Sequence, residues 1–274
     1  MLRWSLYGDA IALGPHWIYE PDKIAARFGV ITGPTDPPAD LYHPKKKKGD
    51  QTHYGDQTLC LLCSILDNEG KFDPAHFAHR WRAMWNGYDD YFDKATKQTL
   101  SALDEGVSWE EAGSDSTELG GAARLGALLV SDAVKDENSL VAAARTQTGL
   151  THCSGISLET AEFLARAAYR RLHGAPLREA LHSAAADSPD ADFSKWLSQA
   201  ENLATGGASG AEIVAQTGAS CGIPQALPAT MALALRHEKG TPLAALCENA
   251  AAGGDSAARG LALGLLLGTD SAFV

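Results

Sequence analysis

Residues 49–66 read GDQTHYGDQTLCLLCSIL and carry the tetrapeptide Gly-Asp-Gln-Thr twice, with His53 and Tyr54 between the copies. An apolar helical run follows directly, so the stretch gathers polar groups at the N-terminus of a helix. That end of a helix has unpaired N–H groups and a partial positive charge. The local sequence alone favours a helix cap in which Asp56 accepts these N–H bonds. The same groups are also placed to bind a ligand, and the rest of the chain decides between the two interpretations.

Apolar residues recur with helical spacing along nearly the whole chain, whereas strand-type alternation of β-branched residues is nearly absent. Alanine, the strongest helix former, is abundant. These patterns predict a single all-α domain over residues 1–274, with about a dozen helices of ordinary length. Residues 29–51 and 206–210 are expected to be loops. The expected helices cover residues 2–12, 24–28, 59–66, 74–85, 91–103, 119–132, 140–148, 158–172, 177–186, 193–204, 224–237, 243–252 and 256–267.

The bulk composition is that of a soluble globular protein, with 45% hydrophobic and 21% charged residues. A formal net charge of -11 argues against nucleic acid and against an anionic membrane surface as partners. A cationic partner, or none, fits this charge better. The longest apolar run, residues 261–267, is far too short to span a bilayer.

Cysteine usage favours a reduced, cytoplasmic setting. The five cysteines are an odd number, and the apolar start of the chain is interrupted by Asp9, unlike a secretory signal. Cys60 and Cys63 form a C-x-x-C pattern inside an apolar helical run. We expect buried core cysteines there, because redox and zinc roles need an accessible thiolate or a second ligand pair.

Three acidic residues lie at glycine-rich junctions between helices and loops: Asp9, Asp56 and Asp255. Asp255 precedes the apolar run of the last expected helix, so it is again a candidate helix cap. The repetition of one chemistry in one setting, far apart in sequence, favours a functional role as well. Hard cations such as magnesium take carboxylate, hydroxyl and carbonyl oxygens, and metal sites between bundle helices are common.

Five segments carry a resemblance to a known family. They are Gly-Asp-Ala with Leu-Gly in residues 8–14, Tyr-Gly-Asp-Gln-Thr in 54–58, Gly-Gly-Ala-Ala-Arg in 120–124, Thr-His in 151–152 and Gly-Gly-Asp-Ser-Ala-Ala in 253–258. Each segment alone is weak, but their order and spacing are similar to the ADP-ribosylglycohydrolase family, which also includes the J1 crystallins.

The resemblance implies an all-α fold with a central cleft that holds two magnesium or manganese ions. In the family, these ions bind the ribose hydroxyls of ADP-ribose and the attacking water. Metal ions orient a diol and lower the pKa of water, and a nearby carboxylate serves as general base. Carried over by motif, Asp56 and Asp255 are the expected catalytic residues and metal ligands, with Glu20 as a third ligand.

The chain departs from the family motifs at the expected metal ligands. Gly55 stands where a hydroxyl is expected, and Gln57 stands where a second Asp is expected. Ala257 and Ala258 replace an Asp and a Thr. Because lost carboxylates make desolvation of a dication costly, we expect one Mg²⁺ or Mn²⁺ ion, or none, rather than two. A lysine, or an arginine such as Arg259, is an alternative to a missing ion.

Further candidate residues have ordinary structural alternatives. Trp17 either stacks on a base or packs under a loop, and His53 is either a base or a hydrogen-bonded loop residue. The four lysines of residues 45–48 are expected to form a solvated face, and a nucleophilic role for Cys153 is not favoured. The predicted substrate-binding residues, each beside one of the motifs, are His16, Trp17, His53, Gln57, Thr58, His152 and Ser256.

The resemblance predicts a hydrolase that cleaves a glycosidic bond of an ADP-ribose conjugate, with a degenerate metal site. The expected partner is a small molecule or an ADP-ribosylated substrate, and nothing in the sequence indicates an oligomeric state. Three alternatives stay open. They are a binder of ADP-ribose or nucleotides that has lost hydrolysis, a pocket rebuilt for another small molecule with metal-free recognition by Gln57 and His53, and a crystallin-like structural protein.

Overall fold

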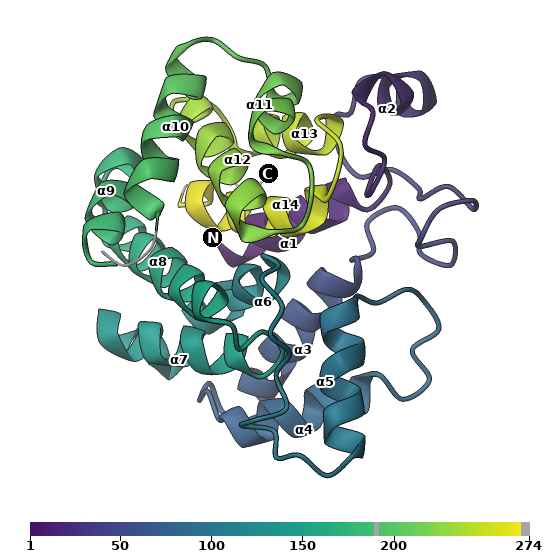
Figure 1. The fold of residues 1–274 in the computed structure, drawn as a ribbon, viewed down its shortest axis with the longest axis vertical. Coiled ribbons are helices and arrows are strands. Elements are labelled where there is room, and N and C mark those ends of the chain that lie inside the picture. Colours follow the sequence, from purple (N-terminus) through teal and green to yellow (C-terminus); the bar gives the residue numbers. More distant parts are fainter. Residues whose placement is uncertain (189–191, 270–274) are drawn as a thin grey trace.

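Two helices from opposite ends of the chain lie side by side at the centre of the molecule (Figure 1). The computed structural model describes residues 1–188 and 192–269. α1 (Leu2–Ala12) packs against α14 (Ser256–Leu267), in which every residue is buried. Glycines make the contact close, because a Cβ added to Gly8 would lie 2.3 Å from the carbonyl oxygen of Gly260. The C-terminal acidic junction is thereby fixed against the first helix.

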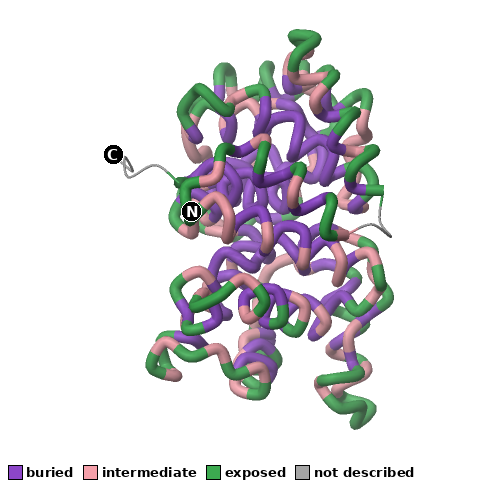
Figure 2. Tube along the Cα trace, turned by 90° about the vertical axis from the view of Figure 1, so that its left-hand side faces the viewer, coloured by how far each residue is buried: buried purple, intermediate pink, exposed green. Residues whose placement is uncertain are grey.

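The other helices surround this central pair, with α10–α13 on one side, α7–α9 on another and α3–α5 below, as Figure 1 shows. The tube in Figure 2 is buried along its middle and exposed at its periphery. The surrounding elements are α2 (Pro21–Phe28), α3 (His53–Asp67), α4 (Pro74–Met84), α5 (Lys94–Asp104), α6 (Gly120–Ala123), η1 (Arg124–Val130), η2 (Asp132–Lys135), α7 (Glu137–Gly149), α8 (Gly155–Leu172), α9 (Leu177–Ala186), α10 (Phe193–Thr205), α11 (Gly210–Thr217), α12 (Ile223–Arg236) and α13 (Pro242–Ala251).

The prediction of an all-α fold is confirmed. Within residues 1–188 and 192–269 the structure contains no strand, only two isolated bridges, between Ser114 and His152 and between Glu118 and Gly222. No helix in this described part has the length and apolar character needed to cross a bilayer. Cys60 is buried in α3, and burial raises the pKa of its thiol to about 12, as expected for a core cysteine. The same expectation is wrong for Cys63, which is only half-buried.

α3 begins earlier than the sequence pattern predicted, at His53 rather than at Leu59. Its N-cap is Thr52, whose hydroxyl accepts a hydrogen bond from the backbone N–H of Tyr54 at 3.1 Å. The prediction that Asp56 caps this helix is therefore wrong, because Asp56 is already inside α3, where its own N–H donates to the carbonyl oxygen of Thr52 at 2.9 Å. The motif belongs to the start of the helix, not to the loop before it.

One further prediction of secondary structure was wrong, and one helix was missed. Residues 119–132 do not form one helix, because α6 gives way to the 3₁₀ helix η1 at Arg124 and extended Ser131 ends it. The chain after residue 209 is helical as α11, which a capping box of Ser209 and Glu212 starts. Sequences rich in glycine and other small residues show little helical periodicity, so the capping box rather than periodicity marks the start of α11.

The segment between α2 and α3, here called the 29–52 loop, forms no helix or strand, as predicted. Ionic contacts attach it to its neighbours. Asp40 pairs with Arg27, Lys45 pairs with Asp89, and Nδ1 of His43 lies 3.3 Å from a carboxylate oxygen of Asp90. The loop therefore lies against the chain that follows α4.

Candidate functional site

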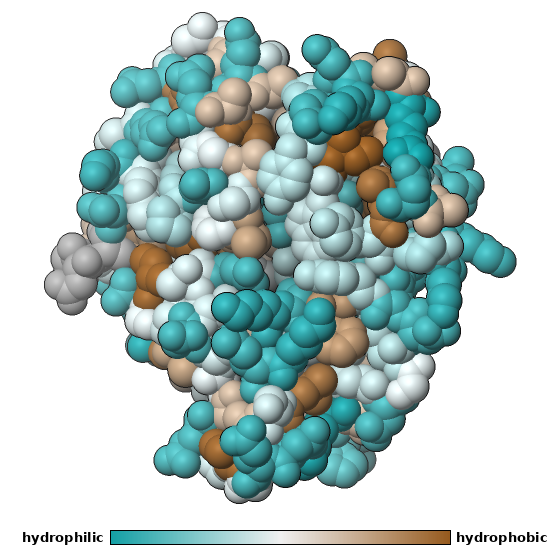
Figure 3. All heavy atoms as spheres, turned by 45° about the vertical axis from the view of Figure 1, so that its right-hand side comes forward, coloured by the Kyte–Doolittle hydropathy of each residue, from teal (hydrophilic) through white to brown (hydrophobic). Residues whose placement is uncertain are grey.

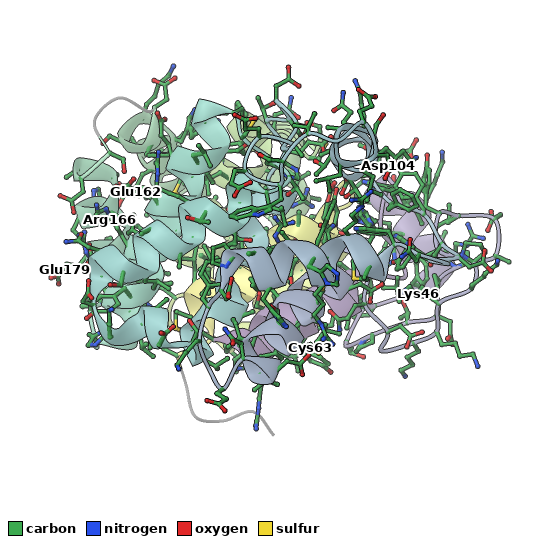
Figure 4. The ribbon with its side chains drawn as sticks, turned by 90° about the horizontal axis from the view of Figure 1, so that it is seen from below. Lys46, Cys63, Asp104, Glu162, Arg166 and Glu179 are labelled. Atoms are coloured by element: carbon green, nitrogen blue, oxygen red, sulfur yellow. The ribbon has the colours of Figure 1, made fainter. Side chains whose placement is uncertain are left out.

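Asp56 lies in the first turns of α3, and 20% of its side chain is exposed. Its Oδ2 accepts a hydrogen bond from Nζ of Lys46 at 2.5 Å and another from the hydroxyl of Tyr88 at 2.6 Å. Figure 4 labels Lys46 on the 29–52 loop, at the opposite end of the molecule from Glu162 and Arg166. Only 18% of the Lys46 side chain is exposed, so the expectation of a solvated lysine face is wrong for this residue.

Asp9 of α1 lies behind Asp56 and is fully buried. Its two carboxylate oxygens accept hydrogen bonds of 2.6 Å from the backbone N–H and the hydroxyl of Thr52. Burial raises the pKa of Asp9 to about 6, in spite of the Thr52 bonds, and the charge of Asp56 adds to the rise. Asp9 therefore fixes the start of α3 on α1.

Steric crowding explains why position 55 is a glycine. A Cβ on Gly55 would lie 2.4 Å from Oδ2 of Asp9 and 2.3 Å from Oε1 of Gln51. Real Cβ atoms do not approach other atoms so closely, so a Ser or Thr here would push Asp9 away from Thr52. The missing hydroxyl of the motif is thus linked to the position of Asp9.

Gln57 faces the interior and is 2% exposed. Its Oε1 accepts hydrogen bonds from Nε1 of Trp81 at 2.8 Å and Nη1 of Arg124 at 2.9 Å. Its Nε2 donates to the carbonyl oxygen of His53 at 3.1 Å. The predicted substrate-binding residue Gln57 therefore uses both ends of its amide inside the protein. Thr58 is buried as well, and its hydroxyl donates to the carbonyl oxygen of Tyr54 at 3.0 Å.

Asp255 is the N-cap of α14 and is fully buried, which confirms the prediction of a cap. Its Oδ1 accepts from the N–H of Ala258 at 3.4 Å. Its Oδ2 accepts from Nε1 of Trp17 at 3.2 Å and from the hydroxyl of Tyr54 at 3.1 Å. Burial raises the pKa of Asp255, although the charge of Arg259 opposes this rise. Both carboxylate oxygens therefore bond to donors of the chain itself.

Among the other predicted site residues, the histidines and Ser256 are buried, whereas Glu20 is exposed. His16 and His53 are buried, and the ring of His16 stacks on Trp17 with 4.2 Å between centroids. His152 is buried and its Nδ1 lies 2.8 Å from the hydroxyl of Thr151. Ser256 is fully buried beside Asp255. Glu20 is exposed, and its carboxylate bonds Lys23 at 3.0 Å.

A pocket of about 250 Å³ lies next to Trp17. Figure 3 turns the side of the molecule that carries α2 and the 29–52 loop toward the viewer, and pale, weakly polar side chains gather near its centre. The pocket is lined by Trp17, Tyr19, Tyr42, Tyr54, Tyr91, Asp93, Lys94, Glu118 and Cys221. We refer to it as the aromatic pocket.

Sequence reasoning found only part of this pocket. It singled out Trp17, which lines the pocket. It missed Tyr91 and Asp93, although residues 88–93 read YDDYFD, a dense run of aromatic and acidic side chains. That composition was the available signal, because both residue types are typical of binding surfaces.

The donor set does not fit the two-ion centre that the family resemblance implies. Asp56 already bonds Lys46 and Tyr88, Gln57 points inward, and position 55 offers no hydroxyl. In the described part of the chain, no group of three or more His, Cys, Asp and Glu side chains is arranged to hold a metal ion. The ammonium group of Lys46 supplies positive charge at the carboxylate where the motif places an ion.

Comparisons with known proteins agree with the motifs. The sequence model of the family described as ADP-ribosylglycohydrolase matches residues 5–270. The chain is similar to an uncharacterized protein of Escherichia coli K12, YegU, with 25% identity over 181 residues, which cover 62% of this chain and 53% of that protein. The matched region thus spans about half the length of that relative. A solved structure described as an ADP-ribosylglycohydrolase-related protein complex has the same fold, with a TM-score of 0.65 and 22% identity over 98% of this chain and 84% of its own.

Proposed function

Because the chain belongs to the ADP-ribosylglycohydrolase family, we propose that it is a hydrolase that cleaves a glycosidic bond of an ADP-ribose conjugate. The observation that carries this proposal is the setting of Asp56. The carboxylate lies at the family's central motif, keeps an edge in contact with solvent and is held by Lys46 and Tyr88. A positioned, partly exposed carboxylate is suited to activate a water molecule.

In this reaction, water attacks the anomeric carbon of the ribose and Asp56 accepts a proton from that water. The new carbon–oxygen bond replaces the glycosidic bond, and the acceptor departs with the electron pair and takes a proton from solvent. The hydroxyl of Tyr88 and the ammonium of Lys46 both bond Oδ2, which leaves Oδ1 for the water. The transition state carries positive charge on the sugar, which a nearby carboxylate stabilises.

We propose further that this hydrolysis needs neither Mg²⁺ nor Mn²⁺. Lys46 brings a cation to Asp56 at 2.5 Å, and no second carboxylate of the motif remains at position 57. Lys47 and Lys48, the exposed residues that follow Lys46, add positive charge to an otherwise acidic protein, in a position to attract a diphosphate.

The test is release of ADP-ribose from arginine-linked and serine-linked peptides, followed in EDTA and again with each metal. We expect release in EDTA and a loss of at least about 100-fold in Asp56→Asn, the size usual for a general base. Asp67→Asn is the matched control, because Asp67 ends the same helix, is exposed and pairs with Arg80. No release by the native protein from either conjugate, with or without metal, would exclude the hydrolase. Release only with Mn²⁺ or Mg²⁺ would exclude the metal-independent reaction.

A second candidate function is binding of ADP-ribose or a nucleotide without hydrolysis. It is favoured by the internal donors on Asp255, since Trp17 and Tyr54 occupy the oxygen that a catalytic metal would need. Calorimetry with ADP-ribose separates the two functions. Binding that persists without turnover in native protein supports the binder, whereas turnover rules it out.

A further inference from the structure

The aromatic pocket is a site apart from Asp56, which does not line it. Two segments nevertheless contribute side chains both to the surroundings of Asp56 and to the aromatic pocket. The 29–52 loop supplies Lys46 to Asp56 and Tyr42 to the pocket, and the chain after α4 supplies Tyr88 to Asp56 and Tyr91 to the pocket. A volume of about 250 Å³ accommodates a small organic group rather than a whole dinucleotide.

Three rings from three separate segments form the walls. Trp17 meets Tyr42 at 4.6 Å between centroids and 82° between planes, and it meets Tyr91 at 4.8 Å and 86°. Tyr42 and Tyr91 are 5.3 Å apart at 73°. Rings set nearly perpendicular to one another present faces toward a common corner. Aromatic faces attract cations, and the ring of Tyr91 already lies 4.9 Å from the ammonium of Lys97.

Two carboxylates close the pocket, and each has an oxygen without a hydrogen-bond partner. Asp93 is 3% exposed; its Oδ1 accepts from the N–H of Thr96 at 2.6 Å, while its buried Oδ2 lies 3.3 Å from Nε2 of His53 without a well-formed hydrogen bond. Oε1 of Glu118 accepts from Sγ of Cys221 at 3.2 Å, and its buried Oε2 has no partner. A buried charged oxygen without a donor is costly, so both atoms are positions where a ligand N–H would bind favourably.

Other titratable groups lie around the two carboxylates of the pocket. Nε2 of His53 lies 3.3 Å from Oδ2 of Asp93, too poorly aligned for a regular hydrogen bond. Burial raises the pKa of Asp93, but the nearby His53 more than offsets this and holds the pKa well below its ordinary value. Lys94 is exposed at the rim. In the described residues, neither Asp93 nor Glu118 has an ion pair with a lysine or arginine. Burial raises the pKa of Glu118, and the charges of Asp93 and Asp255 add to the rise.

Trp17 is held in its place by more than packing. It has a positive φ of 62°, a conformation that is rare for a bulky residue. Its backbone N–H donates to the carbonyl oxygen of Gly254 at 3.0 Å, and its indole donates to Asp255. A strained residue persists where its surroundings fix it, and such residues cluster at ligand sites.

We propose that the aromatic pocket binds a primary alkylammonium group. Its N–H donors would bond the carboxylates of Asp93 and Glu118, which both line the pocket, and its alkyl chain would lie against Trp17, Tyr42 and Tyr91. The excess of carboxylates repels phosphate, so this is not the place for the diphosphate of ADP-ribose. The inference goes beyond glycosidic hydrolysis and does not depend on it.

The first test is calorimetry with butylammonium on the full chain, against probes that lack one feature each. Butanol lacks the charge, butyrate reverses it, and butyltrimethylammonium keeps the charge without N–H donors. We expect butylammonium to bind at least about tenfold more tightly than each of the others, since a hydrogen bond to a charged group has that effect. Equal or tighter binding of butanol or butyltrimethylammonium would overturn the proposal, as would undetectable binding of butylammonium.

The second test removes the two acceptors. Asp93→Asn keeps a good N-cap for α5 and removes the charge, and it should weaken butylammonium binding about tenfold. Glu118→Gln, which caps no helix, should have a similar effect and serves if Asp93→Asn does not fold by circular dichroism. Asp104→Asn, an exposed residue paired with Arg82, is the matched control and should leave binding unchanged. Unchanged affinity in a folded Asp93→Asn or Glu118→Gln variant would refute the site.

Discussion

Asp56 and Asp255 have the same chemistry at the start of a helix but opposite surroundings. Asp255 caps α14, is fully buried and bonds Trp17, Tyr54 and the N–H of Ala258. Asp56 caps nothing, keeps an exposed edge and bonds Lys46 and Tyr88. The difference shows that one motif can place its carboxylate in the core while the other leaves its carboxylate in contact with solvent. Substitutions near the two residues should therefore divide into effects on stability and effects on function.

The largest loss of stability is expected for Asp255→Ala. It removes a cap and leaves the indole N–H of Trp17 and the hydroxyl of Tyr54 buried without an acceptor. The free energy of unfolding should fall by about 3–5 kcal/mol, measured by urea denaturation. Asp255→Asn, which keeps an acceptor oxygen, is the control and should lose less. A loss below about 1 kcal/mol for the alanine variant would remove the distinction between the two aspartates.

Asp9, which lies behind Asp56, should make stability depend on pH. Its pKa in the folded protein is about 6, above the value of about 4 in an unfolded chain. The folded protein therefore binds the extra proton, and the favourable contribution of Asp9 is complete below about pH 4 and lost as the pH rises through about 6. The difference in unfolding free energy between native protein and Asp9→Asn should fall by roughly 2–3 kcal/mol between about pH 4 and pH 7. A difference that is constant with pH would contradict the buried carboxyl.

Gly55→Ala tests the steric reason for the missing hydroxyl. The new Cβ would lie 2.4 Å from Oδ2 of Asp9, so Asp9 or Thr52 must move. We expect a loss of about 2 kcal/mol in urea denaturation, as is usual for overpacking. Gly49→Ala is not a matched control because of its positive φ, whereas Gly155→Ala is, since nothing lies within 4 Å of that added Cβ. Equal stability of the two variants would show that Gly55 has another cause.

Of these four substitutions, Lys46→Met should lower stability least, and its main effect should be on ADP-ribose release. The pair with Asp56 keeps some contact with solvent, so its loss should cost about 1 kcal/mol. ADP-ribose release should nevertheless fall about tenfold or more, because the cation beside the carboxylate is gone. Lys45→Met removes a more exposed pair, with Asp89, and is the control. Full activity in Lys46→Met would mean that Lys46 is only a structural partner.

Much of the fold could be predicted from the sequence. Long periodic segments such as residues 177–186 and 256–267 were predicted with the bounds that the structure has. Predictions were wrong or missing where periodicity is unclear. Residues 119–132 form separate short helices instead of one, and α11 was missed. Helix periodicity reports on burial of one face, so it is silent where glycine and alanine pack on all sides.

The site was less predictable, for a different reason. The sequence allowed a lysine in place of an ion but could not identify Lys46 as the partner of Asp56. It also did not indicate that Gln57 would turn toward Arg124, or that Tyr91 and Asp93 would join Trp17. Each of these contacts joins segments distant along the chain, and a motif specifies only its own neighbours. Composition could indicate that residues 88–93 belong to a binding surface, but it could not indicate which residues from other segments complete that surface.

By itself, the sequence determined the all-α class, the family and the acidic residues at helix starts, because these depend on local spacing and on the order of motifs along the chain. Only the tertiary structure decided which aspartate is a buried cap and which faces solvent, and that an ammonium group occupies the side of Asp56 where a metal was expected. The physical reason is that burial and charge pairing are set by contacts across the molecule. The stretch from Gly49 to Leu66 thus specifies the fold, and its partners Lys46, Tyr88 and Asp9 specify the chemistry open to it.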